Sequence, residues 1–254
     1  MRGVLRVDHG RMLDRLGIEV TLLVDAARHG VPEARVGGAS GRTVRESVRH
    51  VGDVCEDALS WLGVDEDDAA RWASGEGSDV EALSRRVTDR SADLLAELRR
   101  RPPDDPCPTW WPGDHTTRFW LRRALHAALV HRTDVETAVW HAHATVDAVL
   151  ALDGIDEVLR AWLAHRLHAL GVVPQSTWVA RVQAGGEAWL VSAEACGIGV
   201  HRDDAGGSVD ATLSGTPQHV YLWLWGRLPD RMVTTAGDHH VIAQLWSLLR
   251  IATR

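Results

Sequence analysis

The chain has 254 residues, 45% of them hydrophobic and 25% charged, which is typical of a globular protein with a sizeable core. Its 28 basic and 35 acidic residues give a net charge of -7 without any long basic run, so nucleic acid is not expected as a partner. We find no apolar stretch of about 18 residues for a membrane span and no signal peptide. We therefore expect a cytoplasmic protein that does not enter a membrane.

The first half of the chain has the apolar spacing of helices. Apolar residues recur at steps of three and four from Met12 to Ala27, from Val44 to Leu62 and from Val80 to Leu98. The second of these helices should begin with a capping box, formed by Thr43 and Glu46. The longest helix is predicted over 117–141, a run without Pro or Gly. Four such helices favour a bundle, in which sites are built from inward-facing side chains.

The second half of the chain has a different period. A helix is predicted over 151–171, with Asp153 as its N-cap and Gly171 at its end. Short runs of β-type spacing follow between Gly-rich turns, at 176–182, 187–193, 208–215 and 231–237. Further helices are predicted at 217–228 and 238–252. This half is therefore expected to form a small α+β domain.

Two histidines, His126 and His131, lie five positions apart on the predicted fourth helix. An α-helix sets such residues about 140° apart, so they should point to different sides. The face around His131 carries small residues and one carboxylate, Asp134, and His50 lies on the second helix. Two inward histidines on separate helices could bind a divalent metal. Equally, both could be ordinary hydrogen-bonded helix residues.

Five segments of the sequence carry a family resemblance. In order they are GRTVRESVRHVGDV, TRFWLRRALHAALVHRTDVETA, LALDGIDEVL, VYLWLWGRLPD and TTAGD. They resemble the hallmarks of the mycothiol-dependent maleylpyruvate isomerase family, over nearly the whole chain. The resemblance implies a DinB-like four-helix bundle over 1–150, followed by a connecting helix and an α+β C-terminal domain over 151–254.

The resemblance also implies a function. It predicts an isomerase or thiol S-transferase that uses mycothiol as cosubstrate and acts on a small electrophilic substrate bearing a carboxylate. The expected partners are that substrate and a low-molecular-weight thiol, in a monomer or homodimer. The alternatives are a thiol-independent enzyme that uses His131 and Asp134 as an acid–base pair, and a non-catalytic protein that binds a small molecule.

The family holds a divalent metal, typically zinc, with a His on the second helix and a Glu-x-x-x-His pair on the fourth. By this resemblance His50 and His131 are expected metal ligands. Ala127 stands where the family has Glu, so the expected acid is missing. A metal-free site is one alternative, because two ligands alone hold zinc weakly.

Three groups could replace the missing acid. A π-bulge in the fourth helix would turn His126 onto the face of His131. Asp134 could act as a ligand, or as the partner that orients the imidazole. Asp53 could reach in from the second helix.

Three further residues are candidates for substrate or thiol binding. Arg227 matches an Arg that the family uses in its smaller domain, where its planar donors could hold a carboxylate; alternatively it caps a helix C-terminus. Arg42 replaces a Trp that the family shows before TVR, and either meets an anionic substrate or thiol, or is solvated. Trp111, beside Trp110, lines a pocket or packs in the core.

Overall fold

The computed structural model describes residues 7–64, 79–141, 144–203 and 206–253. These residues form two compact units. One, the bundle unit, comprises Asp8–Gly37 and Gly41–Ala144. The other, the α+β unit, comprises the residues from Thr145 onward together with Val7 and the short segment Gly38–Ser40. None of the described helices is long and apolar enough to cross a membrane.

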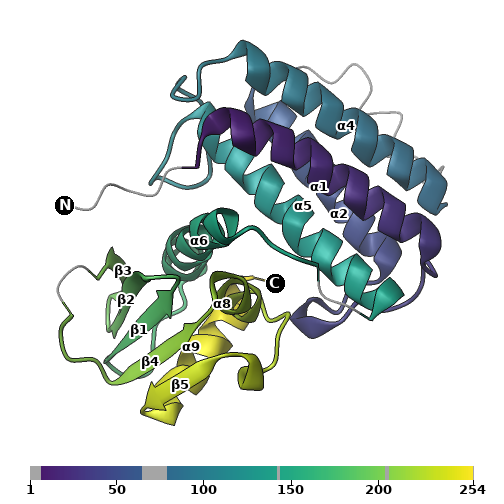
Figure 1. Ribbon diagram of the computed structural model, residues 1–254. Coiled ribbons are helices and arrows are strands. Elements are labelled where there is room, and N and C mark those ends of the chain that lie inside the picture. Colours follow the sequence, from purple (N-terminus) through teal and green to yellow (C-terminus); the bar gives the residue numbers. More distant parts are fainter. Residues whose placement is uncertain (1–6, 65–78, 142–143, 204–205, 254) are drawn as a thin grey trace. The chain divides into compact units, whose positions relative to one another are not determined.

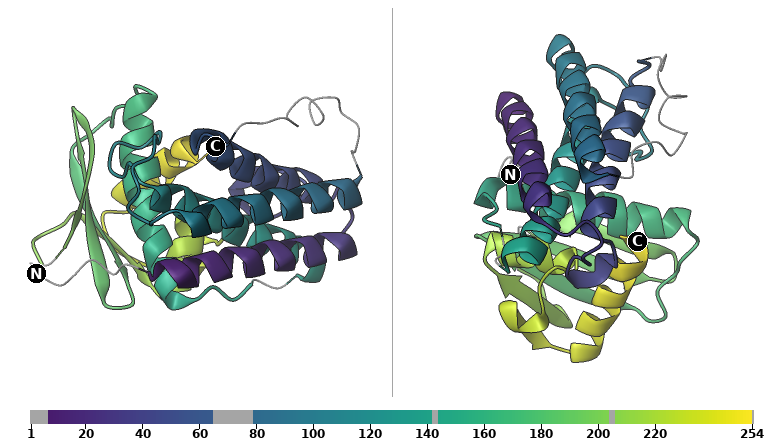
Figure 2. Two further views of the ribbon diagram at one scale, coloured as in Figure 1. Left: turned by 90° about the horizontal axis from the view of Figure 1, so that it is seen from above. Right: turned by 90° about the vertical axis from the view of Figure 1, so that its right-hand side faces the viewer.

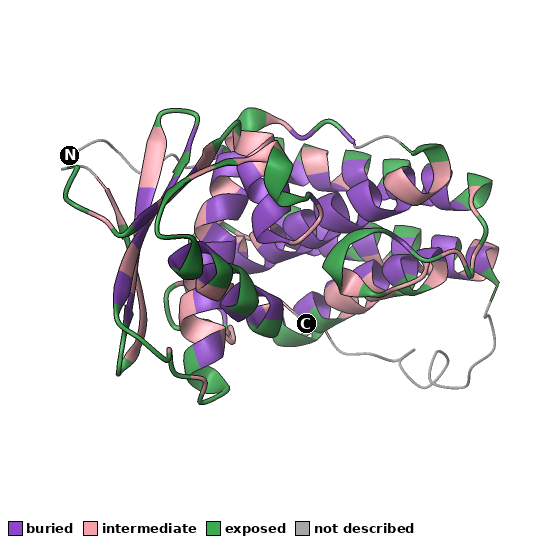
Figure 3. Ribbon diagram, turned by 90° about the horizontal axis from the view of Figure 1, so that it is seen from below, coloured by how far each residue is buried: buried purple, intermediate pink, exposed green. Residues whose placement is uncertain are grey.

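Long helices dominate the described part of the bundle unit. They are α1 (His9–His29), α2 (Val44–Trp61), α4 (Val80–Arg100) and α5 (Thr117–Trp140). Helix α1 packs against α5 and α4, and α2 packs against α4 and α5 (Figure 1). Their inward sides carry the buried residues (Figure 3). The predicted four-helix bundle is thereby confirmed.

Local capping fixes where these helices begin. Glu46 Oε2 accepts from the Thr43 backbone N–H at 2.7 Å, and Thr43 Oγ1 accepts from the Glu46 N–H at 3.2 Å. This is the predicted capping box, which satisfies two backbone donors at the start of α2. At α4 the N-cap is Asp79, whose carboxylate accepts from the Glu81 N–H.

The helix predicted over 151–171 begins earlier and is not regular. It consists of α6 (Ala148–Glu157), the π-helix η2 (Val158–Arg166) and the short α7 (Leu167–Ala169). Its N-cap is Asp147, whose carboxylate accepts from the backbone N–H groups of Val149 and Leu150. The prediction of Asp153 as N-cap was therefore wrong: Asp147 satisfies the free N–H groups one turn and a half upstream.

The described part of the α+β unit contains a five-stranded sheet of order β3-β2-β1-β4-β5. The strands are β1 (Trp178–Ala184), β2 (Glu187–Glu194), β3 (Gly197–Arg202), β4 (Ala211–Gly215) and β5 (Thr234–Gly237). Strands β1 and β4 are parallel, and the other neighbours are antiparallel. Strand β3 was not predicted from the sequence, because Gly197 and Gly199 interrupt the apolar alternation that identifies a strand.

One face of this sheet is buried under helices. Ala180 pairs with Val191 and Val182 with Trp189, and all four side chains are fully buried. The covering helices include η2, α8 (Pro217–Leu224) and α9 (His239–Ala252), as Figure 2 shows. A 3-10 turn, η3 (Asp230–Met232), follows α8. The predicted small α+β domain is confirmed.

Candidate functional site

The two histidines expected at the metal position lie side by side in the bundle unit. The ring centroids of His50 on α2 and His131 on α5 are 4.9 Å apart, and the ring planes are nearly perpendicular at 81°. His131 is buried, with 4% of its surface exposed, whereas His50 is partly exposed. Helices α2 and α5 are packed neighbours, so the pair is held between two regular elements.

Asp134 completes this arrangement from the same helix as His131. One carboxylate oxygen, Oδ2, lies 3.2 Å from His131 Nδ1, and Asp134 is only 2% exposed. This distance is that of an ionic contact between the carboxylate and the imidazole. We call His50, His131 and Asp134 the histidine site.

The described residues do not supply the donors that a family-type zinc site needs. Among them no cluster of three or more His, Cys, Asp or Glu side chains is placed to hold a metal. Ala127 lies one turn before His131 on the same face and is buried with 3% exposure, so a methyl group occupies the position of the expected Glu. Two imidazoles fall short of the three or four protein ligands typical of zinc.

The structure shows where the three conceivable replacements for that acid lie. Helix α5 is α-helical from Thr117 to Trp140, so it lacks the π-bulge that would turn His126 toward His131. Instead His126 is completely buried elsewhere on the helix. Asp53 faces α4, where it lies 3.2 Å from Arg86 Nη2. Of the three replacements, Asp134 is the one that the fold places at His131.

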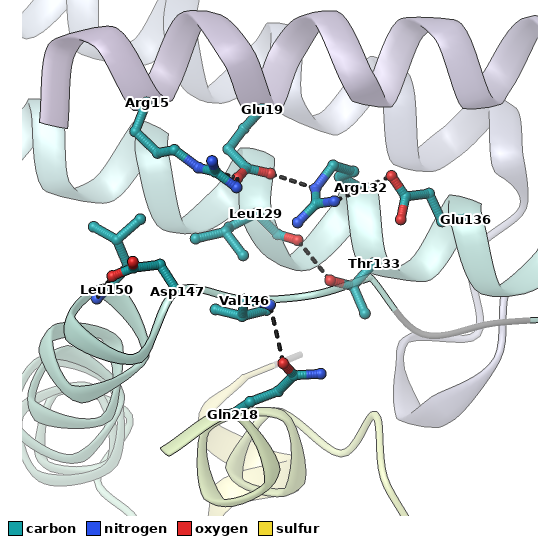
Figure 4. Close-up of polar contacts among 10 residues, drawn as sticks. All are labelled: Arg15, Glu19, Leu129, Arg132, Thr133, Glu136, Val146, Asp147, Leu150 and Gln218. Atoms are coloured by element: carbon teal, nitrogen blue, oxygen red, sulfur yellow. Dashed lines mark hydrogen bonds and ion pairs between the residues drawn. The ribbon is translucent and has the colours of Figure 1, made fainter. Parts of the chain in front are cut away.

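A buried ionic network lies next to the histidine site and was missed by the sequence analysis. Glu19 on α1 is completely buried and forms ion pairs with Arg132 on α5 and with Arg15 one turn earlier (Figure 4). Arg132 also contacts Glu136, with Nη1 and Oε1 3.1 Å apart. The available signal was Glu19 itself, a carboxylate within the apolar side of a predicted helix. Because Arg132 follows His131, this network fixes the rotation of α5 that turns His131 toward α2.

The other candidates in the bundle unit have structural contacts. Trp110 and Trp111 both pack on the buried ring of Phe119, with centroids 5.1 and 6.2 Å from it. A Cβ on Gly113 would lie 2.5 Å from the Trp111 ring, so glycine is needed for this packing. Arg42 is partly exposed just before the N-cap of α2, and its carbonyl accepts from the Val36 N–H at 2.9 Å.

Arg227 lies in the α+β unit, just after α8. Its Nη1 donates to the carbonyl of Trp225 at 2.5 Å, so it does help to cap the C-terminus of α8. A second arginine reaches the same turn, because Arg250 on α9 donates to the carbonyl of Leu224. Arg227 is partly exposed and Arg250 is 7% exposed.

A helical bundle with inward histidines, followed by a small α+β domain, defines a DinB-like bundle protein with a C-terminal domain. Two family models match the chain: the mycothiol maleylpyruvate isomerase N-terminal domain over residues 13–136, and the MDMPI C-terminal domain over residues 149–244. The chain therefore belongs to the mycothiol-dependent maleylpyruvate isomerase family.

Comparison with solved structures agrees with this fold. A crystal structure of the mycothiol-dependent maleylpyruvate isomerase superposes with a TM-score of 0.59 at 15% identity, covering 91% of this chain and 95% of that one. A double mutant of the sec-alkyl sulfatase PisA1 gives a TM-score of only 0.32 at 12% identity, covering 80% of this chain and 31% of that one. A search of curated protein sequences gives no significant match.

Proposed function

We propose that the protein is a mycothiol-dependent isomerase or S-transferase that acts on a small, electrophilic, carboxylate-bearing substrate. Membership of the family supports the class of reaction. The observation that carries the assignment to particular residues is the contact between His131 and Asp134, 3.2 Å long, beside the ring of His50. An imidazole oriented in this way is suited to remove a proton from a thiol.

The thiol is activated by proton transfer. His131 Nε2 takes the proton from the sulfhydryl of mycothiol, while Asp134 holds Nδ1 and stabilises the imidazolium that forms. His50, at the edge of the same ring, is the second polar group that faces the thiol. The described donors do not form a metal cluster of three, so the proposal assigns this step to the side chains alone.

The thiolate then attacks the substrate. Its sulfur forms a bond to one carbon of an activated C=C, and the π electrons move to the conjugated carbonyl oxygen to give an enolate. Rotation about the former double bond, its re-formation and loss of the thiolate complete an isomerisation. Alternatively, return of the proton from His131 to carbon completes an S-transfer. Arg227 is assigned to the substrate carboxylate, which a planar guanidinium can hold in two-point fashion.

A second candidate function is acid–base catalysis without a thiol. It is favoured by the same His131–Asp134 contact, which places a carboxylate beside a candidate base. The two functions differ in one measurable requirement, the thiol cosubstrate.

The test is turnover of a panel of small α,β-unsaturated carboxylates, with and without mycothiol. The wild type is compared with His131→Ala, with Asp134→Asn and with the control His201→Ala, which changes an exposed strand residue. Activity that requires mycothiol, is lost in His131→Ala and is retained in His201→Ala supports the first function. Activity without thiol supports the second, and saturable binding without any turnover would identify a binding protein.

A further inference from the structure

Arg250 is a buried cation without a carboxylate partner in the described part of the chain. It is 7% exposed, and none of the described carboxylates forms an ion pair with it. Its Nη2 donates to the carbonyl of Leu224, but Nε and Nη1 are buried and make no hydrogen bond to any described residue. Buried guanidinium donors are normally satisfied, so an exception calls for a functional explanation.

A second guanidinium lies close to this one. The pKa of Arg250 is lowered to about 10, mainly by burial and to a lesser extent by the positive charge of Arg227. Arg250 therefore still carries its charge at neutral pH. Arg227 and Arg250 donate to the carbonyls of two consecutive residues, Trp225 and Leu224. Like charges are thus held together at the end of α8.

The turn that holds them is built around a glycine. Gly226 has φ +71°, and a Cβ there would lie 1.6 Å from Arg250 Nη1 and 2.9 Å from Ala39 Cβ. The Ala39 N–H donates to the Gly226 carbonyl at 3.0 Å and closes the other side of the turn. Arg250 therefore occupies space that a side chain at position 226 would fill. The absence of that side chain lets the Arg250 guanidinium lie beside Arg227.

Helix capping alone does not account for this pair. The C-terminus of a helix attracts a cation modestly through its carbonyl dipoles. One arginine would serve that purpose, whereas a second adds repulsion and a further desolvated charge. The face of Trp246, 5.3 Å from the Arg250 guanidinium carbon, contributes a cation–π contact but no hydrogen-bond acceptor.

We propose that Arg227 and Arg250 together form a binding site for an oxyanion, either a carboxylate or a phosphate group. A bound oxyanion would accept from Nε and Nη1 of Arg250, which the described protein leaves unsatisfied. It would reach the pair from the side of Arg227, which is partly exposed. This inference rests on the proposed function, because that function assigns Arg227 to the substrate carboxylate. It adds Arg250 as a second hydrogen-bond donor to the same oxyanion.

The test is calorimetric titration with malonate and, separately, with inorganic phosphate, in the absence of thiol and substrate. Arg250→Met should weaken binding at least about tenfold, which is the scale of one charge-assisted hydrogen bond. The matched control is Arg231→Met, which removes an exposed positive charge from the same unit and should leave affinity unchanged. Tighter binding of malonate than of phosphate would identify a carboxylate site, and the reverse a phosphate site.

Thermal unfolding of the wild type provides a measurement that does not depend on the variant folding. Malonate or phosphate should raise the unfolding midpoint above that in sodium chloride of equal ionic strength. Absence of this rise, or unchanged affinity in Arg250→Met, would overturn the inference. Anion binding that needs Arg250 in a protein without turnover would refute the proposed function alone. Turnover with unchanged anion affinity in Arg250→Met would refute this inference alone.

Discussion

His131 Nδ1 and Asp134 Oδ2 lie 3.2 Å apart on adjacent turns of α5, and both side chains are almost completely buried. The contact places a carboxylate against Nδ1 of the imidazole. In a chain that has Ala127 in place of the family's acid, this carboxylate is the acidic group that the fold keeps beside the histidine pair.

Replacing Asp134 with Asn should lower kcat/KM by about 10- to 100-fold, the usual cost of losing a residue that orients an imidazole. The change preserves the shape of the side chain but removes the negative charge beside His131. In a His131→Ala background the same substitution should have little further effect, because the two residues act as a unit. Steady-state kinetics of the four proteins measure this, and additive losses would contradict the assignment.

Replacing Ala127 with Glu should raise zinc affinity at least about tenfold, since it adds a third ligand to two imidazoles. Ala127 is 3% exposed and lies one turn before His131, so the new carboxylate is directed at the histidine site. Competition with a chromogenic chelator measures the affinity. The double variant Ala127→Glu/His131→Ala is the control and should lose the gain; an equal gain in both would disprove the geometry.

Replacing Glu19 with Gln should destabilise the protein by about 3 kcal/mol, the low end of the cost of breaking a buried ion pair, because Arg132 loses one carboxylate partner and keeps Glu136. Glu19 is 0% exposed and pairs with both Arg132 and Arg15. Urea unfolding followed by far-UV circular dichroism measures the change. The matched control is Asp14→Asn on the same helix, whose side chain is 79% exposed and which should change stability by less than about 0.5 kcal/mol.

Replacing Gly226 with Ala should destabilise the protein by about 1–3 kcal/mol, because the backbone has a positive φ there. The new methyl group would also displace Arg250 Nη1, which lies 1.6 Å from its position. Gly207→Ala is the control, since a Cβ there meets nothing within 4 Å. Equal midpoints of thermal unfolding for the two variants would show that the Arg250 side chain is not held by Gly226.

Titration of the native protein with a thiol reagent at pH 8 should modify Cys196 rapidly and Cys55 only after unfolding. Cys196 is exposed, whereas complete burial raises the pKa of Cys55 to about 12 and keeps it as the neutral thiol. Burial likewise raises the pKa of Cys107. Mass spectrometry of the modified protein identifies the site. Rapid modification of Cys55 would show that the α2 helix opens in the native state.

Local sequence patterns predicted much of the fold correctly. The capping box of Thr43 and Glu46 is formed by residues three positions apart, and three of the bundle helices have apolar stripes of helical spacing. The prediction was incomplete where the local signal was weak, or where two nearby residues gave the same signal. Strand β3 was missed because of its glycines, and Asp153 was preferred to Asp147 although both are aspartates near the start of the same helix.

The sequence by itself determined the helices, the α+β half and the family, because periodicity, caps and ordered motifs are properties of neighbouring residues. Only the tertiary structure decided which side chains meet. It brought His50 of α2 against His131 of α5, paired Glu19 of α1 with Arg132, and set Arg250 into the space left by Gly226. Each of these contacts joins distant elements, and it depends on how each helix is rotated when its apolar face is buried.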